Sequence, residues 1–260
     1  MYDVVGVDFS GAVDAGRRIW IAEAHVLGEY LSVRACYPAR ELPGSGTARD
    51  QALSALCELI ASRSGTTFGI DAPLGLPAAV AGTDWHTLVQ TFGSRYADAE
   101  AFKAAALAAG GGRELKRRTD RETATPFSAY NLRMYRQTFY ALRDVVGPLK
   151  GRASVLPMDA PAPGQAQLVE VCPASTLAAN GLGISYKGRT EAHRRGRRAL
   201  VEWLVSSTPA AIPAAIRDLV VGDTGGDAVD ALVAASAAGR AVSVPRPQET
   251  EYLLEGFVYL

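Results

Sequence analysis

Five carboxylates in this 260-residue chain stand near the ends of predicted strands or on a predicted helix: Asp8, Asp71, Glu170, Asp227 and Asp230. Carboxylates held within a few ångströms of one another raise one another's pKa unless a cation neutralises them. Oxygen ligands suit Mg²⁺ or Mn²⁺, which also bind through substrate phosphates. Two such ions about 3.5–4 Å apart can activate a water and stabilise the leaving oxygen of a phosphodiester. We therefore interpret the five residues as a catalytic group, with Asp8, Asp71 and Asp227 as metal ligands.

Each of these acids, taken alone, also fits an ordinary structural role. Asp8 and Asp71 could close turns through their side chains, and Asp227, which follows two glycines, could cap a helix. Glu170 could be paired with an arginine. Asp227 and Asp230 are spaced to share one helix face, so the order strand–Asp, strand–Asp and Asp-x-x-Asp favours the joint interpretation.

The first acid ends a continuous apolar run. Residues 4–7 leave almost no polar face, which is typical of a central strand covered on both sides. Ser10-Gly11 follows Asp8 and predicts a small-residue turn with free backbone N–H groups. Such a turn suits a phosphate or leaves room for a metal, so Ser10 is a candidate substrate-binding residue.

Two further strands follow and predict an antiparallel meander with the first strand. They span residues 17–27 and 30–37, joined by a two-residue loop in which Gly28 supplies a positive φ. A helix over 47–62 then leads to a strand over 66–71, which a right-handed crossover would place parallel to an earlier strand. Because ligands collect beyond the carboxyl ends of parallel strands, we expect Asp8 and Asp71 at one edge of the sheet.

The middle of the chain changes character and predicts a helical insertion at about 78–150. We expect an Ala-rich helix over 83–109, a basic loop over 113–121 and another helix from Ser128 to Val145. Later predicted elements are a parallel strand over 166–172, helices over 191–205, 210–220 and 227–238, and a last strand in 255–260. The prediction is therefore a single α/β domain over 1–260, with a mixed sheet, flanking helices and this insertion.

Charge is unevenly distributed although the formal net charge is zero. Residues 113–204 carry a net charge of +8, between two segments of −4 each. The basic segment favours an anionic partner such as nucleic acid, although solvated helix faces would also account for it. Within it, Arg118, Lys187 and Arg189 are candidate phosphate-binding residues; a local Arg118–Asp120 ion pair and an ordinary surface loop are the alternatives.

The three cysteines are widely spaced and form no C-x-x-C pair, which is typical of buried thiols in a reducing cytoplasm. The chain shows no secretory signal at its start and no apolar run as long as a membrane span, so we expect a cytoplasmic protein without a membrane segment.

Three motifs together carry a family resemblance: residues 7–12 (VDFSGA), 69–77 (GIDAPLGLP) and 226–235 (GDAVDALVAA). They resemble the RNase H-like superfamily, particularly its RuvC-like branch. More closely, the chain is similar to domain-of-unknown-function family 429, a family of predicted RNase H-like nucleases, which RRTD at 117, EVCPA at 170 and YKGR at 186 also fit. The resemblance implies an RNase H-like fold and a metal-dependent nuclease acting on DNA or RNA. RuvC-like resolvases have a Glu where this chain has Asp71.

Two other functions stay open at this point. A nucleotide-dependent phosphotransferase or ATPase of the actin and sugar-kinase type would use residues 8–11 as a phosphate turn and Asp71 as a base. Such enzymes usually contain two related domains, and this chain shows no second strand-acid-glycine opening. A catalytically inactive nucleic-acid-binding protein is the third possibility. Oligomeric state is left open.

Overall fold

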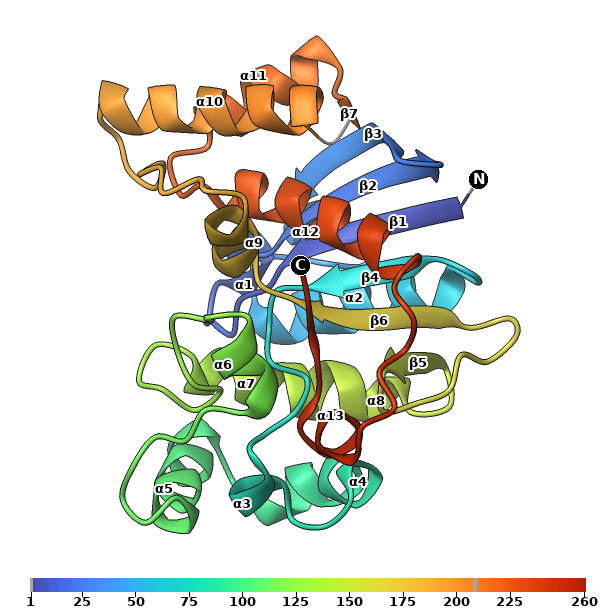
Figure 1. Cartoon of the computed structure of the whole chain (residues 1–260), viewed down its shortest axis with the longest axis vertical. Helices are drawn as coiled ribbons and strands as arrows, with labels where there is room; N and C mark the ends of the chain where they lie inside the picture. Colours follow the sequence, from blue (N-terminus) through green and yellow to red (C-terminus); the bar gives the residue numbers. More distant parts are fainter. Residues whose placement is uncertain (1, 208–209) are drawn as a thin grey trace.

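The computed structural model describes residues 2–207 and 210–260 and shows an α/β architecture around one mixed sheet (Figure 1). The strand order is β5-β6-β4-β1-β2-β3-β7, with β8 paired to β6. The strands are β1 (Tyr2–Asp8), β2 (Trp20–Leu27), β3 (Tyr30–Pro38), β4 (Thr67–Ile70), β5 (Ala153–Leu156), β6 (Ala166–Val171), β7 (Ala210–Ala211) and β8 (Val258–Tyr259). The predicted α/β class with a mixed sheet is confirmed.

Strand β1 lies at the centre of the sheet, antiparallel to β2 and parallel to β4. Gly28, with φ of +61°, begins the predicted two-residue loop between β2 and β3. Strand β6 lies parallel to β4 on its other side. The predicted meander and the predicted parallel strands are therefore both present, and β1, β4 and β6 end at the same edge.

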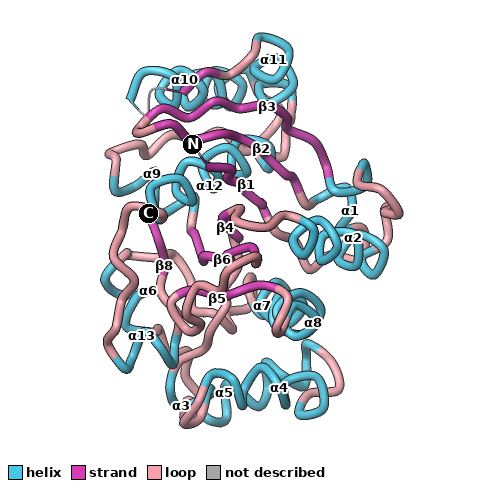
Figure 2. The backbone as a smooth tube through the Cα atoms, turned by 90° about the vertical axis from the view of Figure 1, so that its right-hand side faces the viewer, coloured by secondary structure: helices cyan, strands magenta, loops and turns pink. Residues whose placement is uncertain are grey.

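The helices are α1 (Ala15–Arg18), α2 (Arg49–Ser62), α3 (Ala78–Ala81), α4 (Trp85–Arg95), α5 (Ala99–Ala109), α6 (Arg118–Glu122), α7 (Tyr135–Ala141), α8 (Gly147–Leu149), α9 (Pro173–Ala179), α10 (Glu191–Ser207), α11 (Ala214–Gly222), α12 (Asp227–Ala241) and α13 (Thr250–Glu255). A 3₁₀ turn, η1 (Ala39–Glu41), and a π-helical turn, η2 (Leu142–Val146), complete them. Helices α12 and α2 cover opposite faces of the sheet, and α3, α4 and α5 lie at its β5–β6 end (Figure 2). None of the helices in the described ranges could span a lipid bilayer.

Helix α12 lies directly against the sheet because two glycines leave room for it. Gly6 of β1 and Gly69 of β4 are register partners, so they form one shallow depression. A Cβ on Gly6 would collide with the backbone of Ala231 and Ala235, and one on Gly69 would lie 2.6 Å from the Ala234 oxygen. The predicted helix over 227–238 is therefore confirmed, and these glycines set its distance from β1 and β4.

The insertion differs from its prediction in three places. The helix expected over 83–109 is two helices, because the Asp98 side chain caps α5 by accepting a hydrogen bond from the Ala101 N–H at 2.8 Å. The basic loop expected over 113–121 contains the short helix α6, and the helix expected from Ser128 begins only at Tyr135.

Other elements shift or were not predicted. The helix expected over 210–220 starts at Ala214, after β7, and the last strand is short and follows α13. Strand β5 and helices α1, α9 and α13 were not predicted from the sequence.

Candidate metal centre

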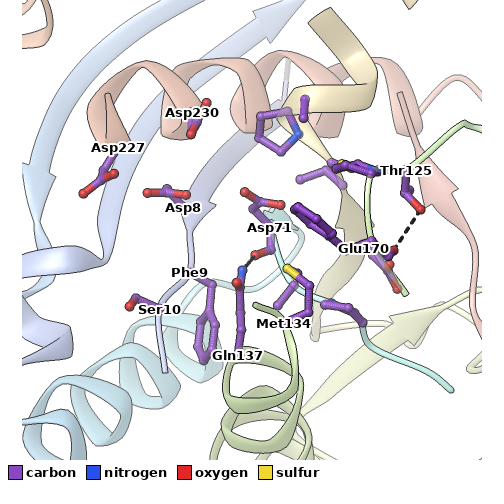
Figure 3. Close-up of a pocket in the computed structure, with 18 of the residues that line it drawn as sticks. Asp8, Phe9, Ser10, Asp71, Thr125, Met134, Gln137, Glu170, Asp227 and Asp230 are labelled. Carbon is purple, nitrogen blue, oxygen red and sulfur yellow. Dashed lines mark hydrogen bonds between the residues drawn. The ribbon is translucent and has the colours of Figure 1, made fainter. Parts of the chain in front are cut away.

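Three aspartates converge at the carboxyl edge of the sheet. Asp8, Asp71 and Asp230 each offer a carboxylate oxygen, and these oxygens lie within 4.8 Å of one another. Asp8 ends β1, Asp71 directly follows β4, and Asp230 lies in the first turn of α12 (Figure 3). The Asp71 N–H donates to the Val7 carbonyl at 2.9 Å, which holds the ends of the two strands together. The expectation that Asp8 and Asp71 meet at one sheet edge is therefore met in the structure.

The pKa values of Asp8, Asp71 and Asp230 are all raised, because the positive charge near these buried carboxylates does not balance their negative charge. Burial raises the pKa of Asp8 well above its usual range, and the charges of Asp230 and Asp71 raise it further. Burial and Asp230 raise the pKa of Asp71 to about 8. Burial also raises the pKa of Asp230, against the lowering effect of Lys187. A divalent cation would relieve this repulsion, and three carboxylates are the hard oxygen donors that Mg²⁺ and Mn²⁺ take. The residues present therefore fit such an ion.

Asp227 lies one helical turn before Asp230, on the wall of the same pocket but outside the closest group of three. Burial and the neighbouring Asp223 raise its pKa to about 6. From the sequence we expected Asp227 as the third metal ligand, whereas the structure brings Asp230 nearest to Asp8 and Asp71. The i, i+3 spacing put both on one helix face but did not distinguish them.

A short strap, residues 186–188, holds Asp230 from the other side. The Tyr186 hydroxyl donates to Asp230 Oδ1 at 2.6 Å, and Lys187 Nζ lies 2.5 Å from Asp230 Oδ2. Burial alone would lower the pKa of Lys187, but Asp230 and Asp8 raise it. Lys187 therefore supplies a positive charge beside the aspartates.

Arg197, which is 2 % exposed, anchors this strap. Its Nη1 donates to the carbonyls of Tyr186 and Gly188, at 2.7 and 2.9 Å. Its Nε donates to the Val221 carbonyl at 2.8 Å, in the last turn of α11. A buried arginine bonded to three carbonyls thus fixes the strap and the segment that leads into α12.

Glu170 is paired with an arginine. This is the structural role that we gave as the alternative to a catalytic role for Glu170. Arg117 Nη2 lies 2.5 Å from Glu170 Oε1, and Arg117 Nη1 donates to Glu170 Oε2 at 2.7 Å. The same guanidinium bonds Asp120, and all three side chains are buried. Glu170 lines the pocket, but Arg117 takes both its oxygens. The structure thus pairs Asp120 with Arg117 instead of the suggested Arg118.

The aspartates line a pocket of about 390 Å³ whose wall includes residues from β1, β6, α12, the strap, the insertion and the segment directly after β4. Comparison with known proteins places this chain in a family. A family model described as "Protein of unknown function (DUF429)" matches residues 6–250. The chain belongs to the DUF429 family. The DUF429 match contains all five aspartates that line the pocket, strand β4 and the strap. No curated protein and no solved structure matches the chain.

The candidate phosphate-binding residues divide into two groups. Ser10 and Lys187 line the pocket. Arg118 lies outside the pocket lining; its Nε donates to Glu122 at 2.8 Å, and its guanidinium lies 4.6 Å from the centre of the Tyr252 ring. Arg189 is exposed and also lies outside the lining.

Sequence reasoning missed four residues that shape this pocket: Arg18, Arg117, Tyr186 and Gln137. Arg117 and Tyr186 stand in motifs that the resemblance included, but their partners are distant in the sequence. The Gln137 side-chain amide donates to the Asp71 carbonyl and so ties α7 to the end of β4. Nothing in the spacing of the glutamine indicated that contact.

Proposed function

We propose that this DUF429 chain is a divalent-metal-dependent phosphodiesterase of the RNase H-like type that hydrolyses a nucleic acid. The observation that carries the proposal is the convergence of three carboxylates, from β1, β4 and α12, within 4.8 Å at one sheet edge. The antiparallel meander followed by parallel strands is the sheet that the resemblance implied, and it supports the RNase H-like assignment. The proposal also places the protein in the cytoplasm, where its three free cysteines would stay reduced.

Asp8, Asp71 and Asp230 would hold Mg²⁺ or Mn²⁺, and Asp227 lines the same pocket. The ion, when bound, would supply charge neutralisation and an activated water. The protein's own residues would orient the substrate: Lys187 would pair with a phosphate oxygen, and Ser10 lines the same pocket. Gln137 and the strap keep Asp71 and Asp230 in place.

The basic middle segment contributes less surface charge than its composition indicates. Arg117 and Arg197 are buried and bond to groups inside the protein, and Arg143 pairs with Asp144. Lys187 is the basic residue that lines the pocket from the strap, with a side chain 54 % exposed. The proposal therefore assigns phosphate recognition at this pocket to Lys187 rather than to the segment as a whole.

The proposal is tested with single-stranded, duplex and branched DNA and RNA in the presence of Mg²⁺ or Mn²⁺. We expect the wild type to cleave at least one form and Asp8→Asn to cleave none. Asp218→Asn, which changes an exposed acid on α11, is the matched control and should keep full activity. No cleavage by the wild type, or equal cleavage by Asp8→Asn, would contradict the proposal. A rise in melting temperature with ATP would favour the phosphotransferase alternative instead.

A further inference from the structure

The pocket has two chemically different ends. One end holds the carboxylates of Asp8, Asp227 and Asp230. The other end includes Met134, Thr125 and Glu170, and both oxygens of Glu170 are bonded by Arg117. The pocket lining also contains the apolar side chains Pro73, Pro126, Phe127 and Pro173, and we call this part the apolar end. Asp71 lies between the two ends in Figure 3, with Asp8, Asp227 and Asp230 on one side and Met134 and Thr125 on the other. A ligand that fills this pocket must therefore carry both a group suited to the carboxylate end and an apolar, flat or flexible part.

The apolar end belongs to the insertion, and two bonded contacts hold it against the carboxylate end. Phe127 and Met134 come from the segment between α6 and α7. The Gln137 amide, one turn into α7, donates to the Asp71 carbonyl. On the other side, Arg117 at the start of α6 bonds Glu170 of β6. These two contacts hold α6 and α7, which flank the segment with Phe127 and Met134, at a fixed distance from the carboxylate end.

Phe127 has the surroundings of a stacking residue. Its ring is half-buried in the pocket wall, and the Arg133 guanidinium lies 5.3 Å from the ring centre. Aromatic rings and guanidinium groups are the side chains on which unpaired bases stack. Met134 adds a flexible thioether, which packs well against an aromatic ring.

The size of the pocket fits one nucleotide. A volume of about 390 Å³ lies in the range of about 300–1,000 Å³ that is usual for sites of small ligands. A nucleotide has a phosphate, which a metal ion held by the carboxylates would bind, and a flat aromatic base, which suits the apolar side chains.

We propose that the apolar end of the pocket is a nucleobase subsite. The base of one nucleotide would stack on Phe127 and Met134 while its phosphodiester lies at Asp8, Asp71 and Asp230. This inference rests on the proposed function and narrows it. Because a base must leave its pair and its neighbours to present a face to a side chain, the substrate is a nucleotide at a strand end, in a single strand or extruded from a duplex.

The test compares two phosphodiesters with the same leaving group: the p-nitrophenyl ester of thymidine 5′-phosphate and methyl p-nitrophenyl phosphate, which has no base. With Mn²⁺, we expect the wild type to prefer the thymidine ester in kcat/KM. Phe127→Ala and Met134→Ala should reduce this preference by about 5- to 100-fold, as loss of a base-stacking contact does, mainly through KM. Leu132→Ala, which changes a side chain 67 % exposed and outside the pocket lining, is the matched control and should keep the preference. Phe127→Leu keeps an apolar side chain at this position but removes the aromatic ring, so it tests stacking. The melting temperature of each variant shows whether it is folded.

Equal kcat/KM for the two esters in the wild type, or an unchanged preference in Phe127→Ala, would overturn the subsite and leave the proposed function standing. If the wild type hydrolyses no ester and no nucleic acid, the proposed function fails, and the subsite is then judged by binding alone. In that case thymidine 5′-monophosphate with Ca²⁺ is titrated calorimetrically. Binding that Phe127→Ala loses supports the subsite, and absence of binding to the wild type overturns it.

Discussion

Lys187 has an unusual position for a single residue. Its ammonium contacts the carboxylate of Asp230, which is also the group that we expect to bind a metal ion. Its Nζ is 2.5 Å from Asp230 Oδ2, and Asp230 is almost fully buried. A divalent ion bound by Asp230 would therefore compete with Lys187 for the same carboxylate. A lysine released by the ion would stay near the pocket, because Arg197 anchors the strap that carries it.

We predict that Lys187→Met binds Mn²⁺ more tightly than the wild type, on the order of tenfold, which corresponds to about 1.4 kcal/mol. The substitution removes the Lys187 ammonium, which competes with Mn²⁺ for Asp230 and also repels the ion. Isothermal titration measures the affinity. Arg189→Met, two residues away and outside the pocket lining, should bind Mn²⁺ like the wild type. Weaker binding by Lys187→Met would show that the lysine assists the ion instead of competing with it.

Asp8→Asn should raise the melting temperature of the metal-free protein at pH 8 while it abolishes Mn²⁺ binding. Burial and three neighbouring aspartates make an ionised Asp8 unfavourable, and an asparagine avoids that cost. A stabilisation on the order of 1 kcal/mol or more is expected, because one pKa unit corresponds to about 1.4 kcal/mol. Differential scanning fluorimetry with EDTA measures it, and a lower melting temperature for Asp8→Asn would contradict the electrostatic account.

Secondary-structure elements bring the aspartates together mainly through one close contact, that of α12 with the glycine depression on β1 and β4. We predict that Gly6→Ala destabilises the protein by about 1–3 kcal/mol or more, because the added Cβ overlaps the backbone of α12. It should also weaken Mn²⁺ binding, since α12 carries Asp230. Urea denaturation gives the stability. Gly183→Ala, where a Cβ meets nothing within 4 Å, should change it little, and equal effects of the two variants would contradict the argument.

The buried triad Arg117–Asp120–Glu170 joins α6 to β6. Arg117→Met should destabilise the protein by about 3–5 kcal/mol, because it leaves two buried carboxylates without their cation. Arg118→Met removes two exposed ion pairs and the contact of the guanidinium with the Tyr252 ring, so a much smaller destabilisation is expected there. Denaturation at neutral pH compares the two neighbours. A small effect of Arg117→Met would mean that Asp120 and Glu170 are protonated or solvated once the arginine is gone.

Local patterns predicted the elements that carry the aspartates. The apolar runs before Asp8 and Asp71 and the Ala-rich stretch after Asp227 are strong local signals, and β1, β4 and α12 followed from them. Asp98 was overlooked because the alanines on either side of it favour one continuous helix.

The choice of partners within the site depends on tertiary contacts that a sequence does not display. Arg117 and Arg118 are equivalent in type, and only the position of α6 turns one inward to Glu170 and the other outward to Glu122. In the same way, the depth of α12 in the glycine depression decides that Asp230 rather than Asp227 joins Asp8 and Asp71. The sequence thus predicted the carboxylates that gather at this sheet edge but not which three lie closest together.

For the whole molecule, the raised pKa values predict how stability depends on pH. Asp71 titrates at about 8 and Asp227 at about 6 in the folded, metal-free protein, whereas an unfolded aspartate titrates at about 4. The folded state therefore binds more protons than the unfolded state between these values. Its stability must fall as the pH rises from about 4 to about 8.

We expect the melting temperature in EDTA to be higher at pH 5.5 than at pH 8.5. With Mn²⁺ the carboxylates are held deprotonated, so the stabilisation that the ion provides should grow with pH. Melting curves at both values, with and without Mn²⁺, check both statements, and Asp71→Asn should reduce the slope in EDTA. A metal-free protein that becomes more stable as the pH rises from 5.5 to 8.5 would contradict the charge distribution described above.

The position of α12 also has a consequence for how the chain folds during its synthesis on the ribosome. Strand β1 ends at Asp8, but the helix that covers one of its faces begins only at Asp227. Contacts between such distant segments form late, and until then the apolar face of β1 is available to chaperones. Asp8 and Asp230 consequently meet only after α12 has been synthesised. A partial chain that ends before α12 therefore lacks the group of three carboxylates.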